Sequence, residues 1–340
     1  MKELIIKGEL SDSQILVGES FLNFARYLPK NRQVIVLTDD RIQKLYGSHF
    51  TAYQTIVIGQ TEKVKTLATV DAIIEQLITL QADRSTFLLV VGGGIVCDIG
   101  GFVASIYMRG IAFGFISTTL LSQVDASVGG KNGVNFSGFK NIVGTFNQPR
   151  FVICDPQMLT TLKPDELING FAEIVKHTLI ADKAMFHWLS QHFEKALSLD
   201  ADTIEKLVFN SVSIKASIVN KDEKEQGERR KLNLGHTYGH AIEKVFHLSH
   251  GKAVSLGLVV AARLSMEKGF LNNDEFHQIM QLLKDLKLPV EIPDKQERVL
   301  QALTMDKKRK GALVHFILIE GIGQARIEPI ALNVLQKMLT

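Results

Sequence analysis

The stretch Thr86–Met108, TFLLVVGGGIVCDIGGFVASIYM, decides how the first half of the chain folds. Its opening residues, Thr86–Val91, form an almost wholly apolar run, typical of a strand buried on both faces. Three glycines, Gly92–Gly94, follow this run, and we expect a helix over Ile99–Met108 beyond them. Such a turn lets backbone N–H groups approach a pyrophosphate at the positive end of a helix. It is not the G-x-G-x-x-G fingerprint, so by itself it favours a nucleotide site and a plain glycine turn about equally.

The residues before this stretch repeat the alternation of strand and helix. Gln33–Thr38 and Thr55–Ile58 are β-branched runs typical of strands, and Thr66–Leu80 places apolar residues at helical spacing. Strands that alternate with helices build βαβ units, so we predict a mostly parallel sheet.

From about Pro156 onward, strand-like runs become rare and helix-type periodicity dominates. It covers Asp165–Leu199, Ala201–Val219 and Val254–Lys268. Because proline disfavours helix in the residue before it, Asp155-Pro156 gives a domain junction a local cause. We therefore predict an α/β nucleotide-binding domain over residues 1–155 and an all-α, metal-binding domain over residues 156–340. The late apolar run Ala312–Ile319 fits a strand or a buried helix.

Composition limits the classes of protein to which the chain can belong. Its 340 residues are 46% hydrophobic and 22% charged, which excludes a disordered protein and suggests two packed domains. Scattered charges summing to +3 argue against nucleic acid or a membrane surface as a partner. Two distant cysteines, Cys97 and Cys154, are expected to be free thiols in a reducing compartment. With no secretory signal and no membrane-length apolar run, we expect a cytoplasmic protein.

Histidines and a carboxylate provide a candidate metal site. His236 and His240 are four residues apart, the spacing at which two imidazoles on one helix face can share a metal ion. His250 follows, and Glu173 occurs earlier on a mostly apolar helix with Lys176 three residues later. These groups suffice for a catalytic zinc site with three protein ligands. A lone H-x-x-x-H is more often packing or surface, but the two glycines of this motif, Gly235 and Gly239, indicate close approach by another group.

A loop of small residues, Asp125–Lys131, carries a carboxylate and a lysine that could close on an anionic ligand. Other polar residues are individually typical of solvated surface positions. They are Lys140, Asn141, Lys215, Arg229 and Asn233.

Taken together and in this order, the motifs resemble the 3-dehydroquinate synthase family. The similar segments are residues 92–110, 118–135, 170–176, and 222–240 followed by 250–251. The resemblance implies a lyase of the shikimate pathway of aromatic amino acid biosynthesis. Its substrate would be a phosphorylated sugar acid, 3-deoxy-D-arabino-heptulosonate 7-phosphate, converted to 3-dehydroquinate and phosphate. It implies an N-terminal domain that binds NAD, a C-terminal domain that holds zinc or cobalt, a substrate cleft between them and a homodimer.

The resemblance also assigns residues to roles. Metal ligands fall on Glu173, His236 and His250, which moves His240 to the substrate side. NAD contacts fall on Asp39, Glu62, Lys65, Gly93, Gly94, Asp98, Thr118, Thr119, Lys140 and Thr161. Substrate contacts fall on Asp125, Lys131, Asn141, Lys176, Lys215, Arg229, Asn233, His240 and either Lys307 or Lys308. Arg109 matches an arginine that reaches the neighbouring subunit's phosphate site.

The sequence departs from the family pattern at four positions, none of them an assigned ligand: Cys97, Ser117, Phe139 and Lys252. Three alternatives remain open. A metal-dependent polyol dehydrogenase could share the two-domain plan but needs no cations for phosphate and carboxylate. A cyclase that forms a different carbocycle would bind no substrate carboxylate. A non-catalytic, regulatory descendant would be expected to have lost a metal ligand.

Overall fold

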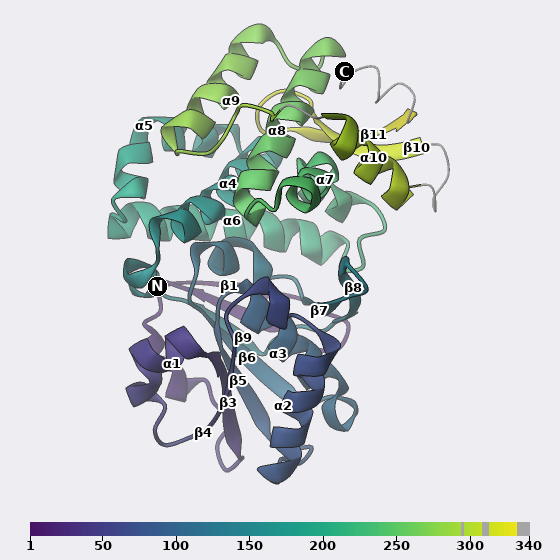
Figure 1. The fold of residues 1–340 in the computed structure, drawn as a ribbon. Helices are drawn as coiled ribbons and strands as arrows, with labels where there is room; N and C mark the ends of the chain where they lie inside the picture. Colours follow the sequence, from purple (N-terminus) through teal and green to yellow (C-terminus); the bar gives the residue numbers. More distant parts are fainter. Residues whose placement is uncertain (294–295, 308–312, 332–340) are drawn as a thin grey trace. The chain divides into compact units, whose positions relative to one another are not determined.

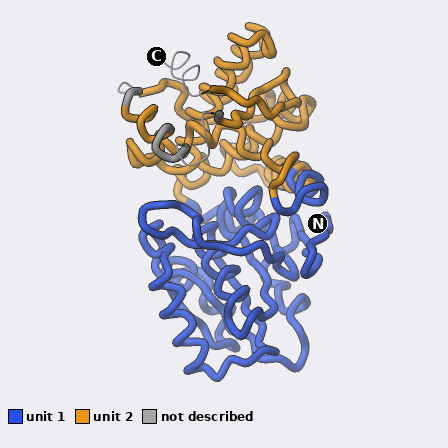
Figure 2. Tube along the Cα trace, turned by 90° about the vertical axis from the view of Figure 1, so that its right-hand side faces the viewer, with its two compact units in different colours: residues 1–162, 215–224 blue, residues 163–214, 225–340 orange. Residues whose placement is uncertain are grey.

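A computed structural model of the chain describes residues 1–293, 296–307 and 313–331. The chain divides into two compact units (Figure 2). Unit 1 comprises residues 1–162 and 215–224, and unit 2 comprises residues 163–214 and 225–340.

Unit 1 is built on a seven-stranded sheet with the order β1-β2-β9-β6-β5-β3-β4. Its strands are β1 (Lys2–Ile6), β2 (Ser13–Val17), β3 (Val34–Asp39), β4 (Gln54–Ile58), β5 (Phe87–Gly92), β6 (Ala112–Ser117) and β9 (Phe151–Cys154). All neighbours are parallel except β1, which runs antiparallel to β2. The predicted parallel sheet is therefore confirmed.

Three helices cover the two faces of this sheet: α1 (Asp40–Tyr46), α2 (Leu67–Thr79) and α3 (Gly94–Ile106). Strand β4, which follows β3 in the sequence, pairs with one edge of β3. After α2, the chain forms β5, which pairs with the other edge of β3. Accordingly α1 lies on one face while α2 and α3 lie on the opposite face (Figure 1). The strand order thus reverses between β3 and β5, the point at which open α/β sheets bind ligands beyond the carboxyl ends of their strands.

Helix α3 begins at Gly94, five residues before the predicted start at Ile99. Gly93 is extended (φ −77°, ψ −175°), so the chain turns from strand into helix within one residue. The packing is close, because a Cβ on Gly100 would lie 2.6 Å from Val90 Cγ2. Glycine in this helix therefore serves its close approach to the sheet, and apolar periodicity does not reveal where such a helix begins.

A two-stranded antiparallel ribbon joins β7 (Lys131–Phe136) to β8 (Phe139–Phe146). Its two-residue turn, Ser137-Gly138, has φ of 49° and 79°, as a type I′ hairpin turn requires. Phe139, one of the departures from the family pattern, pairs with Phe136 at the start of the ribbon. Asn141 then adopts a positive φ of 51°.

Unit 2 is mainly helical, as predicted (Figure 1). Its helices are α4 (Pro164–Ala181), α5 (Lys183–Leu197), α7 (His236–Phe246), α8 (His250–Glu267), α9 (Asn273–Asp285) and α10 (Gln296–Lys307), while α6 (Ala201–Lys221) contributes residues to both units. Asp182 separates α4 from α5, because its carboxylate accepts the backbone N–H of Met185 at 2.9 Å. The late apolar run forms a strand, β10 (Leu313–Ile319), paired with β11 (Ala325–Ala331).

Candidate active site

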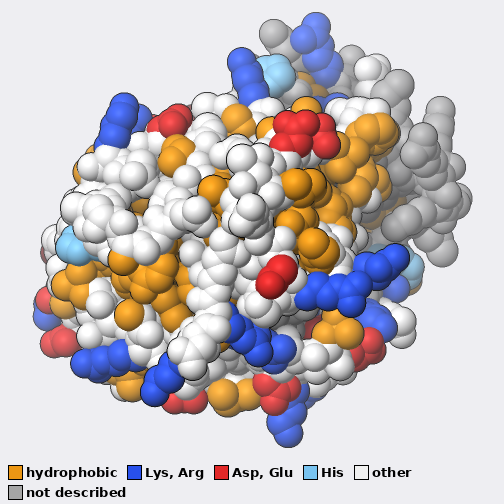
Figure 3. Space-filling model, turned by 90° about the horizontal axis from the view of Figure 1, so that it is seen from below, with side chains coloured by type: hydrophobic (Ala, Val, Ile, Leu, Met, Phe, Trp, Pro, Cys, Tyr) orange, Lys and Arg blue, Asp and Glu red, His pale blue; other side chains and the backbone are white. Residues whose placement is uncertain are grey.

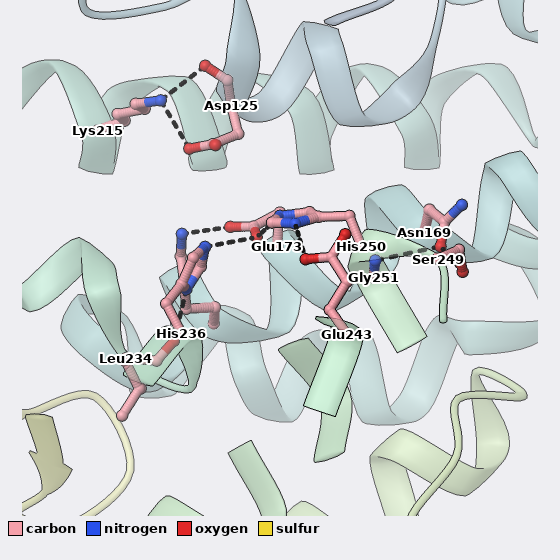
Figure 4. A network of polar contacts seen from close by, with 11 residues as sticks. Asp125, Asn169, Glu173, Lys215, Leu234, His236, Glu243, Ser249, His250 and Gly251 are labelled. Carbon is pink, nitrogen blue, oxygen red and sulfur yellow. Dashed lines mark hydrogen bonds and ion pairs between the residues drawn. The ribbon is translucent and has the colours of Figure 1, made fainter. Parts of the chain in front are cut away.

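Three helices of unit 2 bring a carboxylate and two imidazoles together. Glu173 lies in α4, while His236 and His250 are the first residues of α7 and α8. One ligand atom from each lies within 4.8 Å of the others. Glu173 Oε1 is 3.1 Å from His250 Nε2 and 3.5 Å from His236 Nε2 (Figure 4). The residues that the family pattern assigns to the metal therefore converge on one point.

The protonation states of this cluster suit a divalent ion. His236 Nδ1 lies 3.1 Å from the carbonyl oxygen of Leu234, which can only accept, so Nδ1 carries the proton and the Nε2 lone pair faces Glu173. Burial, together with nearby Lys176, lowers the pKa of His236 to about 3, so the ring is neutral at pH 7. Glu173 is fully buried and forms an ion pair with Lys176. One carboxylate oxygen and two imidazole nitrogens match the donors that zinc prefers.

His240 is not one of these three residues. Its ring is exposed and meets His236 edge-on, with ring centroids 5.4 Å apart. Helical spacing placed the two imidazoles near each other, but His250 of the next helix supplies the second imidazole of the cluster.

Two residues that the sequence analysis did not single out lie beside His250 (Figure 4). Asn169 Oδ1 accepts hydrogen bonds from Ser249 Oγ at 2.7 Å and from the Gly251 N–H at 3.2 Å. Glu243 Oε2 lies 4.0 Å from His250 Nδ1. Asn169 lies one turn before Glu173 on α4, so helical spacing could have placed it on the same helix face as Glu173.

Three candidate NAD residues of unit 1, Asp39, Gly93 and Gly94, flank the switch point of the sheet. Asp39 ends β3 and caps α1, accepting the N–H groups of Arg41 and Ile42. Burial raises the pKa of Asp39. Across the switch point, a Cβ on Gly93 would lie 3.0 Å from Thr119 Cγ2, and one on Gly94 would lie 3.0 Å from Ala126 Cβ. This backbone therefore has the shape of a phosphate-binding turn before a helix.

Other candidate NAD residues are linked by contacts of their own. Lys65 forms an ion pair with Asp98, whose pKa is raised by burial although the lysine opposes this effect. Lys140 lies 3.8 Å from Glu62. The remaining two threonines hydrogen-bond locally: the Thr118 N–H donates to Gly92 O at 3.0 Å, and Thr161 Oγ1 is 3.1 Å from Tyr46 Oη.

Two candidate substrate residues of unit 1, Asp125 and Lys215, contact each other, and three others lie at the surface. Asp125 lies in a π-helix, η5 (Ser122–Ala126), and Lys215 Nζ donates to its carboxylate and to its carbonyl, each at 2.6 Å (Figure 4). Arg109, Lys131 and Asn141 are exposed. Single-turn π-helices occur often at functional sites, which favours a functional role for Asp125.

In unit 2, Lys176 and Arg229 are almost fully buried, and Asn233 Nδ2 donates to Glu225. Lys307 is the last residue of α10, and its side chain is not described. Lys308 lies outside the described residues.

Three of the four departures from the family pattern, Cys97, Ser117 and Lys252, lie outside the β7–β8 ribbon that contains Phe139. Cys97 is a buried free thiol whose Sγ lies 3.7 Å from Gly92 O, and Cys154 is also buried and free, as predicted. Ser117 is the buried last residue of β6. Lys252 extends to Asp165 of α4 at 3.3 Å.

Two family models together match residues 55–309 of the chain. The model of the 3-dehydroquinate synthase N-terminal domain matches residues 55–169, and that of the C-terminal domain matches residues 170–309. The chain belongs to the 3-dehydroquinate synthase family. The family's enzyme from Alkaliphilus metalliredigens is 36% identical over 96% of this chain and 95% of its own length. The one from Campylobacter concisus is 43% identical over 80% of this chain and 79% of its own.

Solved structures with similar folds include sugar phosphate cyclases and, at lower identity, dehydrogenases and reductases. The 2-epi-5-epi-valiolone synthase of Streptomyces hygroscopicus, with NAD+ and Zn2+ bound, superposes with a TM-score of 0.89 at 27% identity, covering 98% of this chain and 97% of its own. A 2-deoxy-scyllo-inosose synthase complexed with carbaglucose-6-phosphate, NAD+ and Co2+ gives 0.90 at 25% identity, covering 99% of both chains. A structure described as that of a probable glycerol dehydrogenase from Sinorhizobium meliloti has a TM-score of 0.64 at 14% identity, covering 96% of this chain and 94% of its own, and shares the fold alone.

The surface carries charges of both signs. On the face drawn in Figure 3, Lys and Arg side chains are interspersed with Asp and Glu, and apolar side chains lie between them. Within the described residues, no helix is both long enough and apolar enough to cross a bilayer.

Proposed function

We propose that the protein is a 3-dehydroquinate synthase, a phosphate-eliminating carbon–oxygen lyase that converts 3-deoxy-D-arabino-heptulosonate 7-phosphate to 3-dehydroquinate and phosphate. The observation that carries the proposal is the convergence of Glu173, His236 and His250, in a chain that is 36% identical to a 3-dehydroquinate synthase over 96% of its length. A non-catalytic descendant is disfavoured because all three candidate ligands are present and in position.

The proposal assigns two groups to this chain, a divalent ion and NAD. The ion, zinc or cobalt, binds Glu173, His236 and His250, and the turn at Gly93-Gly94 holds the pyrophosphate of NAD. When bound, NAD would accept and return a hydride and the ion would polarise a substrate hydroxyl. The remaining candidate NAD residues, from Asp39 to Thr161, orient the cofactor.

Substrate charge distinguishes this activity from its rivals. A heptulosonate phosphate carries a carboxylate and a phosphate, and each needs fixed cations. Lys215 and Arg229 are proposed for the carboxylate, because a guanidinium offers a bidentate fork and keeps its charge at any relevant pH. The phosphate is assigned to Lys131, Asn141, Asn233, His240, Arg109 and Lys307 or Lys308, and the ring hydroxyls to Lys176 and Asp125. A cyclase of an uncarboxylated sugar phosphate, or a polyol dehydrogenase, has no use for a buried carboxylate-binding arginine.

The experiment measures phosphate release from the heptulosonate phosphate in the presence of NAD and zinc. Arg229→Ala removes a charge-assisted contact worth roughly 1.5–3 kcal/mol, so turnover or substrate affinity should fall by about one to two orders of magnitude. Arg230→Ala is the matched control, since Arg230 is adjacent and only partly buried. NAD and zinc binding should survive both substitutions.

A substrate analogue without the carboxylate separates recognition from structure. It should bind poorly to the parent protein and lose little further affinity on Arg229→Ala, because a direct contact requires that coupling. Equal losses for both ligands would show that Arg229 is structural, and the argument for a carboxylate would then fail.

We also propose a homodimer in which Arg109 reaches the partner's phosphate site. Arg109 is exposed and follows Met108 in a segment where both residues have positive φ, 66° and 51°. Exposed apolar side chains lie at the end of α3, just after it, and on the β7–β8 ribbon, whose first strand contacts α3: Ile106, Met108, Phe136, Phe139, Ile142 and Phe146. Sedimentation equilibrium should give twice the chain mass, and a monomer would refute this part of the proposal.

A further inference from the structure

We propose that Asn169 is a positioning residue for the metal cluster: it caps α8 from α4 and thereby fixes His250 relative to Glu173. The inference rests on the proposed metal site. It concerns a residue to which neither the motifs nor the family pattern gave a role.

The start of α8 lacks a cap of its own. Its N-cap residue, Ser249, makes no side-chain hydrogen bond to the helix backbone. Its hydroxyl instead donates to Asn169 Oδ1 at 2.7 Å, and the same oxygen accepts the N–H of Gly251 at 3.2 Å. The first backbone N–H groups of a helix have no intrahelical acceptor, so Asn169 satisfies one of them from a different helix.

The two donors flank a candidate metal ligand. Ser249 precedes His250 and Gly251 follows it, so one amide oxygen holds the chain on both sides of the imidazole. Asn169 is itself 5% exposed, in the turn of α4 that precedes Glu173. The contact therefore connects the two backbone segments that carry Glu173 Oε1 and His250 Nε2, atoms 3.1 Å apart.

Close backbone contact leaves this junction little freedom. A Cβ on Gly251 would lie 2.4 Å from Asn169 Cα and 2.5 Å from its carbonyl oxygen, so α8 begins against the backbone of α4. Because backbone atoms cannot rotate away as side chains can, the amide of Asn169 fixes the lateral position of α8 at its point of closest approach. Loss of the amide removes the acceptor and lets the first turn of α8 shift, with His250 in it.

The test compares Asn169→Ala with a matched asparagine cap in the same unit. Asn272 caps α9 by accepting the N–H of Glu275 at 2.9 Å and makes no contact with the three candidate ligands. Asn272→Ala should therefore cost stability alone. Both variants remove a side-chain oxygen that accepts an N–H group at a helix N-terminus, so both should lose thermal stability.

Metal affinity is the readout that distinguishes positioning from stability. Zinc dissociation constants are measured by chelator competition, and the d–d spectrum of bound Co2+ reports ligand geometry. Asn169→Ala should weaken zinc binding by about 10- to 100-fold, the range for residues that orient metal ligands, and change the cobalt spectrum. Asn169→Asp, which keeps the acceptor oxygen, should restore affinity to within a few-fold of the parent. Asn272→Ala should bind zinc as the parent does.

The possible failures are distinct. If the parent protein binds no zinc, the metal site of the proposed function is wrong. If the parent binds zinc but Asn169→Ala binds it within twofold of the parent, Asn169 is a stabilising cap and the inference is overturned. Should the alanine variant not fold, Asn169→Ser and Asn169→Asp decide in the same way. The inference would also be overturned if zinc affinity followed thermal stability across the Asn169 variants, whether or not the new side chain keeps an acceptor oxygen.

Discussion

Replacing Gly257 by alanine should separate α7 from α8 and weaken metal binding. A Cβ on Gly257 would lie 1.8 Å from the carbonyl oxygen of Gly235 and 2.6 Å from its carbonyl carbon. Carbon and oxygen atoms that are not bonded essentially never approach within 3.0 Å, so the two backbones must move apart by about 1.2 Å or more. His236 directly follows Gly235, so the movement displaces a candidate metal ligand.

The energetic cost combines two opposing effects. Overpacking a close contact costs about 1–3 kcal/mol, and the backbone acceptor favours the upper end because it cannot rotate away. Alanine in place of glycine recovers about 1 kcal/mol of helix propensity. The net loss of about 2 kcal/mol should lower Tm by roughly 4–8 °C in a unit of this size. A ligand displaced by an ångström should also weaken zinc binding by about 10- to 100-fold.

Leu264→Ala is the control for this experiment. Leu264 is buried in the same helix, 14 residues after His250, and truncation should cost about 2–5 kcal/mol without moving Gly235. Differential scanning calorimetry and chelator competition are run on both variants. Zinc affinity should fall only in Gly257→Ala. An unchanged zinc affinity, or an unchanged Tm, in that variant would refute the reasoning from close helix packing.

Three further outcomes are expected. Gly94→Val should lower NAD affinity at least tenfold, as measured by calorimetric titration. The valine Cβ would lie 3.0 Å from Ala126 Cβ, and its methyl groups would cover the turn. An unchanged NAD affinity would exclude this turn as the pyrophosphate site. Hydrogen bonds from Tyr27, at 2.5 Å, and from Asn23 lower the pKa of Glu19. The Glu19 carboxylate therefore stabilises the fold at pH values above its pKa in the unfolded chain. This stabilisation is lost as the pH falls through the pKa of Glu19 in the folded protein. Tyr27→Phe should therefore lower the free energy of unfolding at pH 7 more than at pH 3 in urea titrations, and equal losses at both pH values would contradict this. EDTA should lower the Tm of the parent protein and added zinc should restore it; a Tm indifferent to both would argue against a bound ion.

The elements that the sequence predicted well are those whose signal is local. The β-branched runs became β3 and β4, and the helical spacing after Thr66 became α2. The start of α3 was wrong by five residues, because Gly94, the last of the three glycines, is already the first residue of the helix. The run at Ala312–Ile319 stayed open because a short apolar segment satisfies strand and helix patterns equally, and only its pairing with β11 decides between them.

The local sequence pattern could not predict that Glu173, His236 and His250 lie close together in the folded chain. Glu173 precedes His236 by two helices and a turn, and no local spacing specifies the angle at which α4, α7 and α8 cross. Spacing favoured His240 because it considers one helix at a time, whereas the first residue of the next helix supplies the second imidazole. The residues alone offered His236, His240, His250 and Glu173 as candidates, and only the resemblance of several motifs in order chose His250 over His240. Asn169 was missed for the same reason, since its partners lie about 80 residues later.

The glycines within the histidine motif show what such a motif specifies. Their presence indicated close approach by another group, and the group is the backbone of α8: a Cβ on Gly235 would lie 3.1 Å from Leu258 N, and one on Gly239 would lie 3.1 Å from Ala253 O. These glycines therefore set the distance between α7 and α8, and with it the separation of His236 from His250. Without these glycines, the two histidines would still be present, but α7 and α8 could not approach closely enough to bring the imidazoles of His236 and His250 together. The motif thus combines a donor with the packing that brings it to its partner, so glycine substitutions should reduce metal affinity without removing any ligand.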